Sequence, residues 1–254
     1  DNRYSLRYSC PMIRDMPADK FEKLSNEAKK KYVVQLLIKE SGASPVHPGL
    51  PPVAFVMAGV PGAGKTEFLD SLVEELEQEK QYGEFVRIDL DQIVTIYPEY
   101  TPKTYAKFRS QGSSVLARCI DELRHKRYNM MIDGTFSGEA GSSVRNVEKL
   151  LSNGYRVIMV YMYDKPEIAW NYTQLREQET DRGITINGFI HACKNVSVNL
   201  KTTLTNHRAN INFSISVVKQ KELRDRNYEI ITDEKEVDKI IEAGYNIDSL
   251  KETL

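Results

Sequence analysis

The chain has 254 residues, a formal net charge of −1 and a hydrophobic fraction of 41%. This is the composition of an ordinary globular protein, with room for one α/β domain and an appendage but hardly for two large domains. The balanced charge gives no electrostatic reason for a nucleic-acid or membrane partner, and no apolar run reaches the roughly 18 residues of a membrane span. We therefore expect a cytoplasmic protein with neither kind of partner.

The cysteine pattern suggests no covalent or metal framework. Cys10, Cys119 and Cys193 are widely separated and form no C-x-x-C motif, and the four histidines have no metal-ligand spacing. Cys119 and Cys193 fall on the apolar faces of predicted helices. We expect both thiols to lie in the core rather than to act as nucleophiles.

The first predicted element is an amphipathic helix over residues 18–41, ending before Gly42. One face is apolar and the other is rich in lysine. The helix can pack on its own domain, or it can act as a docking or inhibitory segment, and the sequence leaves both readings open. A stiff linker with Pro45, Pro48, Pro51 and Pro52 follows it. We therefore predict a helical extension with its linker at residues 1–50 and the main domain at 51–254.

Residues 53–69, VAFVMAGVPGAGKTEFL, combine a short apolar strand, a glycine-rich loop and the start of a helix. The loop fits the pattern G-x-x-x-x-G-K-T with Gly59, Val60, Pro61, Gly62, Ala63, Gly64, Lys65 and Thr66. In such a loop, backbone N–H groups at a helix N-terminus bind phosphate, the lysine contacts the terminal phosphates, and the threonine hydroxyl binds Mg²⁺. The sequence therefore predicts a site for ATP or GTP with Mg²⁺.

Carboxylates follow two later strands. The strand at 84–89 ends in Asp89, with Asp91 two residues beyond it, and the strand at 129–133 ends in Asp133 before Gly134-Thr135. Ligands of open parallel sheets bind at the carboxyl ends of strands, so these acids are expected near the phosphate site. We predict Thr66, Asp89 and Asp133 on the magnesium side, and Asp91 as the base for an acceptor hydroxyl.

Helices and strands continue to alternate along the rest of the chain. A long helix ends at about residue 127 with the basic cluster Arg124, His125, Lys126 and Arg127, which we interpret as structural because cations stabilise a helix C-terminus. Further strands are predicted at 155–163, 213–218 and from 228, with helices from Pro166 through Arg176 and over 187–207. The order predicts a doubly wound, mostly parallel α/β sheet.

A kinase is the favoured class. Arg176 precedes the helix break at 181–183 and Arg182 lies within it, where mobile cations could stabilise a transferred phosphoryl group. They could equally form surface ion pairs with the neighbouring acids. No Asn-Lys-x-Asp guanine reader is present, which disfavours a GTPase. A non-catalytic nucleotide-binding or switch protein stays the alternative from another class.

The segments GVPGAGKTEF, IDLD, RYNMMIDGT and QLREQE resemble the bacterial zeta toxins in order and spacing over residues 52–212. The resemblance implies a kinase that phosphorylates the 3′-hydroxyl of UDP-N-acetylglucosamine with ATP or GTP and is restrained by a helical antitoxin. It implies Lys65 as the phosphate lysine, Thr66 as the magnesium ligand and Asp91 as the base. It also implies Arg176 and Arg182 as the catalytic arginines, with Asp133 and Thr135 on the substrate side.

Three positions depart from the family pattern. Ser137 and Ala117 stand where those toxins carry an arginine and a glutamate, and Asp133 replaces the glutamate of their EGT motif. The two arginines are also closer together in this chain. The residues for phosphate transfer match the family, but the positions that contact the substrate differ. The acceptor could therefore also be the ribose of NAD, another nucleotide sugar or an aminosugar antibiotic. The helix on its proline-rich tether is, in addition, a candidate inhibitor in cis.

Overall fold

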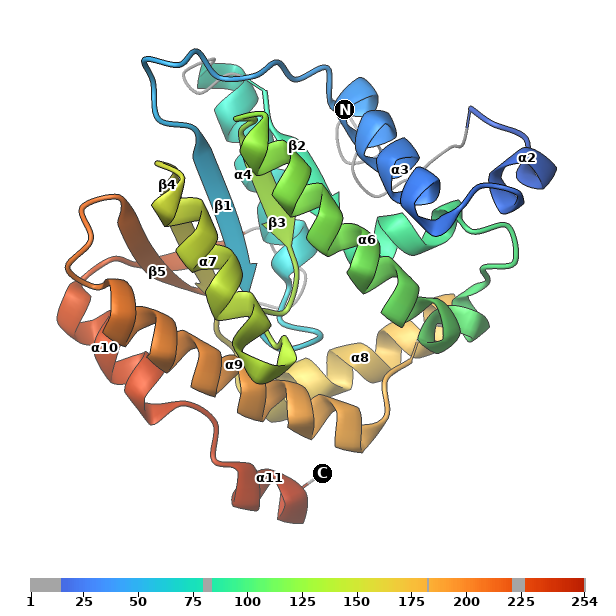
Figure 1. Ribbon diagram of the computed structural model, residues 1–254. Coiled ribbons are helices and arrows are strands. Elements are labelled where there is room, and N and C mark those ends of the chain that lie inside the picture. Colours follow the sequence, from blue (N-terminus) through green and yellow to red (C-terminus); the bar gives the residue numbers. More distant parts are fainter. Residues whose placement is uncertain (1–14, 80–83, 182, 221–226, 254) are drawn as a thin grey trace. The chain divides into compact units, whose positions relative to one another are not determined.

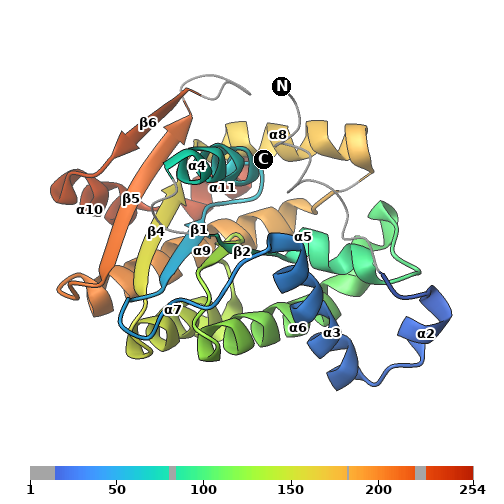
Figure 2. The ribbon, with the colours of Figure 1, turned by 90° about the horizontal axis from the view of Figure 1, so that it is seen from above.

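The computed structural model describes residues 15–79, 84–181, 183–220 and 227–253. These residues form a sheet of six strands in the order β2-β3-β1-β4-β5-β6 (Figure 1). The strands are β1 (Val53–Ala58), β2 (Val86–Asp89), β3 (Met130–Asp133), β4 (Arg156–Met162), β5 (Phe213–Gln220) and β6 (Tyr228–Ile231). β4 and β5 pair in parallel, whereas the edge strand β6 is antiparallel to β5 (Figure 2). The fold is the predicted α/β fold with a mostly parallel sheet.

Helices connect the strands. They are α2 (Ala18–Glu22), α3 (Asn26–Ser41), α4 (Lys65–Glu79), α5 (Leu90–Ile93), α6 (Tyr105–His125), α7 (Ser142–Ser152), α8 (Pro166–Thr180), α9 (Ile186–His207), α10 (Glu234–Ala243) and α11 (Ile247–Thr253). The short 3-10 helices are η1 (Val94–Ile96), η2 (Pro102–Thr104) and η3 (Glu139–Gly141). In the described part of the chain, no helix is both long and apolar enough to cross a membrane.

The chain divides into two compact units. Unit 1 comprises residues 1–53 and 72–132, and unit 2 comprises residues 54–71 and 133–254. The N-terminal residues thus group with a distant part of the sequence, residues 72–132. The sequence pattern marks the proline-rich stretch correctly as irregular, but tertiary packing rather than local composition defines the units.

In unit 1, α3 packs against α6 and β2 (Figure 1). Its apolar face packs inward, and the buried residues are Val33, Val34, Leu36 and Leu37. The single helix predicted over 18–41 is in fact two, since Ser25 begins α3 by accepting a hydrogen bond from the Ala28 N–H at 3.2 Å. Phe21 of α2 contacts the Tyr97 ring, with a centroid distance of 5.9 Å. The N-terminal helices are therefore part of the unit 1 core.

In unit 2, α9 is the central helix. α7, α10 and α11 all pack against it (Figure 1). Cys193 of α9 is buried, as is Cys119 of unit 1, and burial raises the pKa of each thiol to about 12. Both thiols stay protonated at neutral pH, which agrees with the predicted core role. Cys10 lies outside the described residues.

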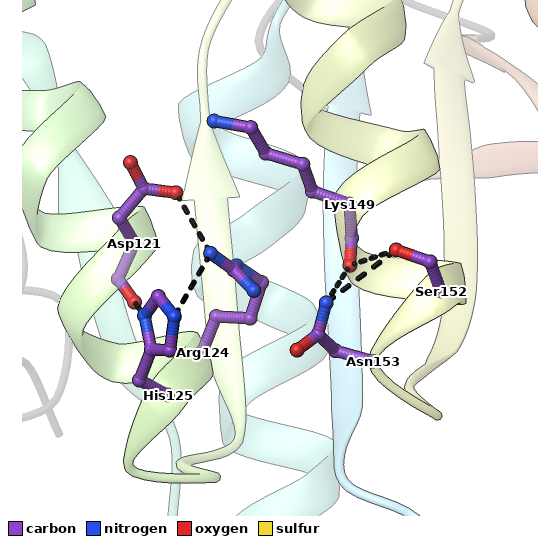
Figure 3. A network of polar contacts seen from close by, with 6 residues as sticks. All are labelled: Asp121, Arg124, His125, Lys149, Ser152 and Asn153. Carbon is purple, nitrogen blue, oxygen red and sulfur yellow. Dashed lines mark hydrogen bonds and ion pairs between the residues drawn. The ribbon is translucent and has the colours of Figure 1, made fainter.

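The basic cluster at the end of α6 takes part in local contacts. Arg124 donates to Asp121 Oδ1 at 3.2 Å, and His125 Nδ1 donates to the Asp121 carbonyl at 2.6 Å (Figure 3). Arg127 donates to the Leu50 carbonyl at 2.6 Å. At the end of α7, Asn153 similarly donates to the Lys149 carbonyl at 2.8 Å (Figure 3). These contacts stabilise helix ends, as the sequence interpretation expects.

Candidate active site

The glycine-rich loop of unit 2 connects the buried strand β1 to the first turn of α4. Its backbone turns through three glycines with positive φ: Gly59 at 147°, Gly62 at 82° and Gly64 at 75°. Lys65, the first residue of α4, donates from Nζ to the Val60 carbonyl at 2.8 Å. Its ammonium group thus lies across the loop, where it can contact a phosphate chain.

Contacts around the loop explain why glycine is needed there. A Cβ at Gly62 would overlap the Ala169 carbonyl and lie 3.1 Å from Thr173 Cγ2, both on α8. A Cβ at Gly59 would lie 2.7 Å from the Met162 carbonyl at the end of β4. The loop backbone is therefore packed directly against α8 and the end of β4, and this packing fixes its shape.

Two oxygen ligands suitable for magnesium meet beside the loop. Thr66 Oγ1 lies 3.5 Å from Asp133 Oδ2, at the long limit of a hydrogen bond, and Asp133 is only 5% exposed. Within the described ranges, no group of three or more His, Cys, Asp or Glu side chains could hold a metal by itself. Since Mg²⁺ usually binds through few protein ligands plus phosphates and water, Thr66 and Asp133 fit this ion.

The turn after β3 is attached to the same loop. The Gly59 N–H donates to the Thr135 carbonyl at 3.2 Å. The Thr135 and Ser137 hydroxyls lie 2.5 Å apart and share a hydrogen bond. Thr135, predicted on the substrate side, is therefore held next to the first glycine, while Ser137 is turned toward Thr135.

Of the two predicted arginines, the structure describes one. Arg176 is half-buried on α8, seven residues after Ala169 and three after Thr173. These spacings place all three residues on one face of the helix, and the first two contact the glycine loop at Gly62. Arg176 thus lies on the face of α8 that packs on the loop. Arg182 lies outside the described residues.

Unit 1 holds the other two predicted acids. Asp89 is buried at the end of β2, and its Oδ1 accepts the Asp91 N–H at 2.8 Å as the N-cap of α5. Asp91 is half-buried, and its Oδ1 accepts a hydrogen bond from the Tyr105 hydroxyl at 2.9 Å. The sequence interpretation missed Tyr105, because nothing local to the first residue of α6 indicates a partner fourteen positions earlier.

Tight packing between two helices determines where Tyr105 lies. A Cβ at Gly112 of α6 would be 2.7 Å from side-chain atoms of Leu90 and Val94. Tyr105 precedes Gly112 by two helical turns and so shares its face of α6. The close approach that Gly112 permits therefore brings the Tyr105 hydroxyl to Asp91.

These features define a class of protein. A G-x-x-x-x-G-K-T loop between a buried strand and a helix, with a carboxylate beside its threonine, is the nucleotide site of a phosphate-loop kinase fold. The profile of the zeta toxin family matches residues 39–236, and the chain belongs to this family. Membership in the family and the loop geometry together make the protein a phosphotransferase of the kinase type.

Solved structures share the fold. The PezAT chromosomal toxin–antitoxin system of Streptococcus pneumoniae matches with 20% identity and a TM-score of 0.59, covering 94% of this chain and 88% of that one. The AvrRxo1-ORF1:AvrRxo1-ORF2 structure with sulphate ions matches with 14% identity and a TM-score of 0.60, covering 91% and 79%. At these identities the likeness extends to the fold alone. Among curated proteins, none matches the sequence.

Proposed function

We propose that the protein transfers the terminal phosphate of ATP or GTP to a hydroxyl of a nucleotide sugar, with the 3′-hydroxyl of UDP-N-acetylglucosamine as the first candidate. The observation that carries this proposal is the glycine loop with Lys65 across it and Thr66 beside Asp133. Family membership supports the kinase class, and the resemblance to zeta toxins supports the acceptor.

The proposed reaction assigns each group a role. The acceptor oxygen attacks the terminal phosphorus, the bond to the bridging oxygen of the leaving nucleotide breaks, and Asp91 takes the acceptor proton. Lys65 and the loop N–H groups bind the phosphate oxygens, while Arg176 and Arg182 stabilise the charge of the phosphoryl group in transfer. Thr66 and Asp133 would hold Mg²⁺, with Asp89 as a further candidate, and the bound ion supplies charge neutralisation between the phosphates.

A second acceptor is favoured by one feature of unit 2. Ser137 stands where zeta toxins carry an arginine, and its hydroxyl bonds to Thr135 instead of extending from the turn. A short hydroxyl cannot replace the long bidentate donor that an arginine offers to a nucleotide sugar. We therefore keep a ribose hydroxyl of NAD as the second candidate, followed by other nucleotide sugars and aminosugar antibiotics.

We also propose a helical antitoxin as the partner that restrains the kinase, as zeta toxins are restrained. The matched PezAT structure is of a toxin–antitoxin system, which supports this assignment. Inhibition in cis by residues 1–50 is the alternative. The burial of the apolar face of α3 within unit 1 favours a structural role for that segment, leaving its charged face for any such contact.

A mass spectrum of a metabolite extract incubated with the protein and Mg-ATP tests the proposal. We expect one nucleotide sugar, or NAD, to gain a single phosphate, and the parallel reaction with Lys65→Ala to leave the extract unchanged. Repeating the reaction with Mg-GTP distinguishes the donors. Nucleotide binding without any phosphorylated product would favour the switch-protein alternative over the kinase.

A further inference from the structure

A buried amide on α9 holds the turn after β3. Asn199 is only 4% exposed, and its Nδ2 donates to the Phe136 carbonyl at 2.9 Å and to the Gly138 carbonyl at 3.0 Å. Asn195, one turn earlier on α9, donates to the intervening Ser137 carbonyl at 3.2 Å. Two amides from one helix thus bind three successive carbonyls of residues 136–138.

The backbone that these amides hold is unusual. Phe136 has a φ of 60°, a conformation uncommon for a bulky residue, and its side chain is 7% exposed. Such a conformation costs about 1–3 kcal/mol and persists only where its surroundings impose it. The two bonds from Asn199 supply hydrogen-bond donors to carbonyls of this turn.

The other end of the same turn belongs to the nucleotide site. Asp133 precedes it directly and lies beside the Thr66 hydroxyl, and the Thr135 carbonyl accepts the Gly59 N–H. Residues 133–138 are therefore fixed at one end to the phosphate loop and at the other to α9. A displacement at Phe136 would move Asp133, since only two residues separate them.

We propose that Asn199 is a positioning residue of the magnesium–nucleotide site, acting through the turn to hold Asp133 against Thr66. This inference rests on the proposed function and adds a residue that touches neither nucleotide nor metal. Groups that orient a metal ligand typically change metal affinity about 10–100-fold when they are removed. Loss of Asn199 should therefore raise the magnesium requirement while leaving catalysis at saturating magnesium close to normal.

The sharpest test is Asn199→Asp, which keeps the shape of the side chain but replaces the two-hydrogen donor with an acceptor facing two carbonyls. Calorimetric titration with a non-hydrolysable ATP analogue measures nucleotide affinity across a range of magnesium concentrations. We expect the half-saturating magnesium concentration to rise about tenfold. The affinity without magnesium should change less than twofold.

Thr203→Val is the matched control. Thr203 lies one turn beyond Asn199 on the same face of α9, is 0% exposed, and its hydroxyl has no hydrogen-bond partner among the described residues. Removing this hydroxyl perturbs the same buried face without touching the turn. Its magnesium dependence should match that of the wild type.

Asn195→Ala keeps the proposal testable if Asn199→Asp does not fold. Asn195 is half-buried and contributes one bond to the same turn, so the variant should fold and shift the magnesium midpoint about threefold in the same direction. Wild-type magnesium dependence in the folded variants, or a shift that Thr203→Val reproduces, overturns the proposal. A wild-type protein that binds no nucleotide overturns the proposed function itself.

Discussion

The glycine-loop residues of unit 2 and the acid pair of unit 1 are held by different kinds of contact. In unit 2 the positions that matter are fixed by backbone: positive φ at Gly62, its contact with the Ala169 carbonyl, and the bond from Gly59 to Thr135. In unit 1 the carboxylate of Asp91 accepts a hydrogen bond from a side chain, the Tyr105 hydroxyl. A site whose shape is set by the backbone requires glycine at particular positions. A site whose shape is set by side-chain contacts can change when a single residue is substituted.

The three departures from the family pattern all lie outside the glycine loop. The loop keeps every position of its motif, whereas the departures are single side chains: Ala117 on α6 of unit 1, which is exposed to solvent, and Asp133 and Ser137 of unit 2. Changing the nucleotide loop would strain its backbone, but changing one helical side chain costs little stability. The following substitutions test the comparison between the two units, from the largest expected effect to the smallest.

Lys65→Ala should have the largest effect, because it removes the charge that we propose to contact the terminal phosphates. We expect turnover to fall by about 10³-fold, comparable with the loss of a preorganised donor in other active sites. The side chain is half-exposed, so the melting temperature should change little. Steady-state phosphate transfer and thermal unfolding measure the two quantities. Normal turnover by a folded Lys65→Ala protein would remove the basis of the whole site.

Asp91→Asn tests the acid pair of unit 1. Loss of the base should lower single-turnover phosphate transfer about 10²–10⁴-fold while nucleotide affinity stays within twofold. Asp89→Asn is the comparison, because asparagine caps a helix as well as aspartate does and so preserves the bond to the Asp91 N–H. That variant should weaken only magnesium-dependent nucleotide binding. Transfer at the wild-type rate by Asp91→Asn would contradict the assignment of the base.

Much of the fold could be predicted because its strands are short buried runs. β2, β3 and β5 each fall within two residues of the predicted ranges, and α8 begins at Pro166 as expected. The loop was equally accessible, since its positive φ angles demand glycines at fixed positions. Local pattern therefore specifies the elements and the nucleotide loop.

The supporting residues could not be predicted with the same certainty, because their partners are distant in sequence. Asn199 bonds carbonyls more than sixty residues away, although Asn199 and Thr203 do occur at helical spacing on an otherwise apolar face of α9. Two polar residues on a buried helix face could have indicated a buried hydrogen-bonding role. Tyr105 offered none, and the break before Asn26 was hidden because the apolar pattern continues across it.

Gly62→Ala tests how strictly the glycine loop of unit 2 depends on glycine. The methyl group would overlap the Ala169 carbonyl at a φ of 82°, so nucleotide affinity should fall at least about tenfold and stability by about 1–3 kcal/mol. Gly154→Ala is the matched control, since Gly154 has a φ of 76° but no described atom within 4 Å of the added carbon. It should lose about 1 kcal/mol of stability and bind nucleotide normally. Equal nucleotide affinities in the two variants would show that the contact with α8 is unimportant.

Tyr105→Phe should have the smallest effect, and it tests whether one hydroxyl orients the base. The substitution keeps the ring and removes the hydrogen bond to Asp91, which should lower kcat about 3–10-fold, the rate equivalent of roughly 1 kcal/mol. Tyr32→Phe is the matched control, because the Tyr32 hydroxyl also donates to a carboxylate of unit 1, Asp15 Oδ1, at 2.7 Å. It should leave kcat unchanged. A rise in the KM of the acceptor with an unchanged kcat would mean that Tyr105 binds the acceptor instead of positioning Asp91. In that case the orientation of Asp91 would depend on α5, on which it lies, and not on Tyr105. The two units would then differ only in the residues that contact the acceptor.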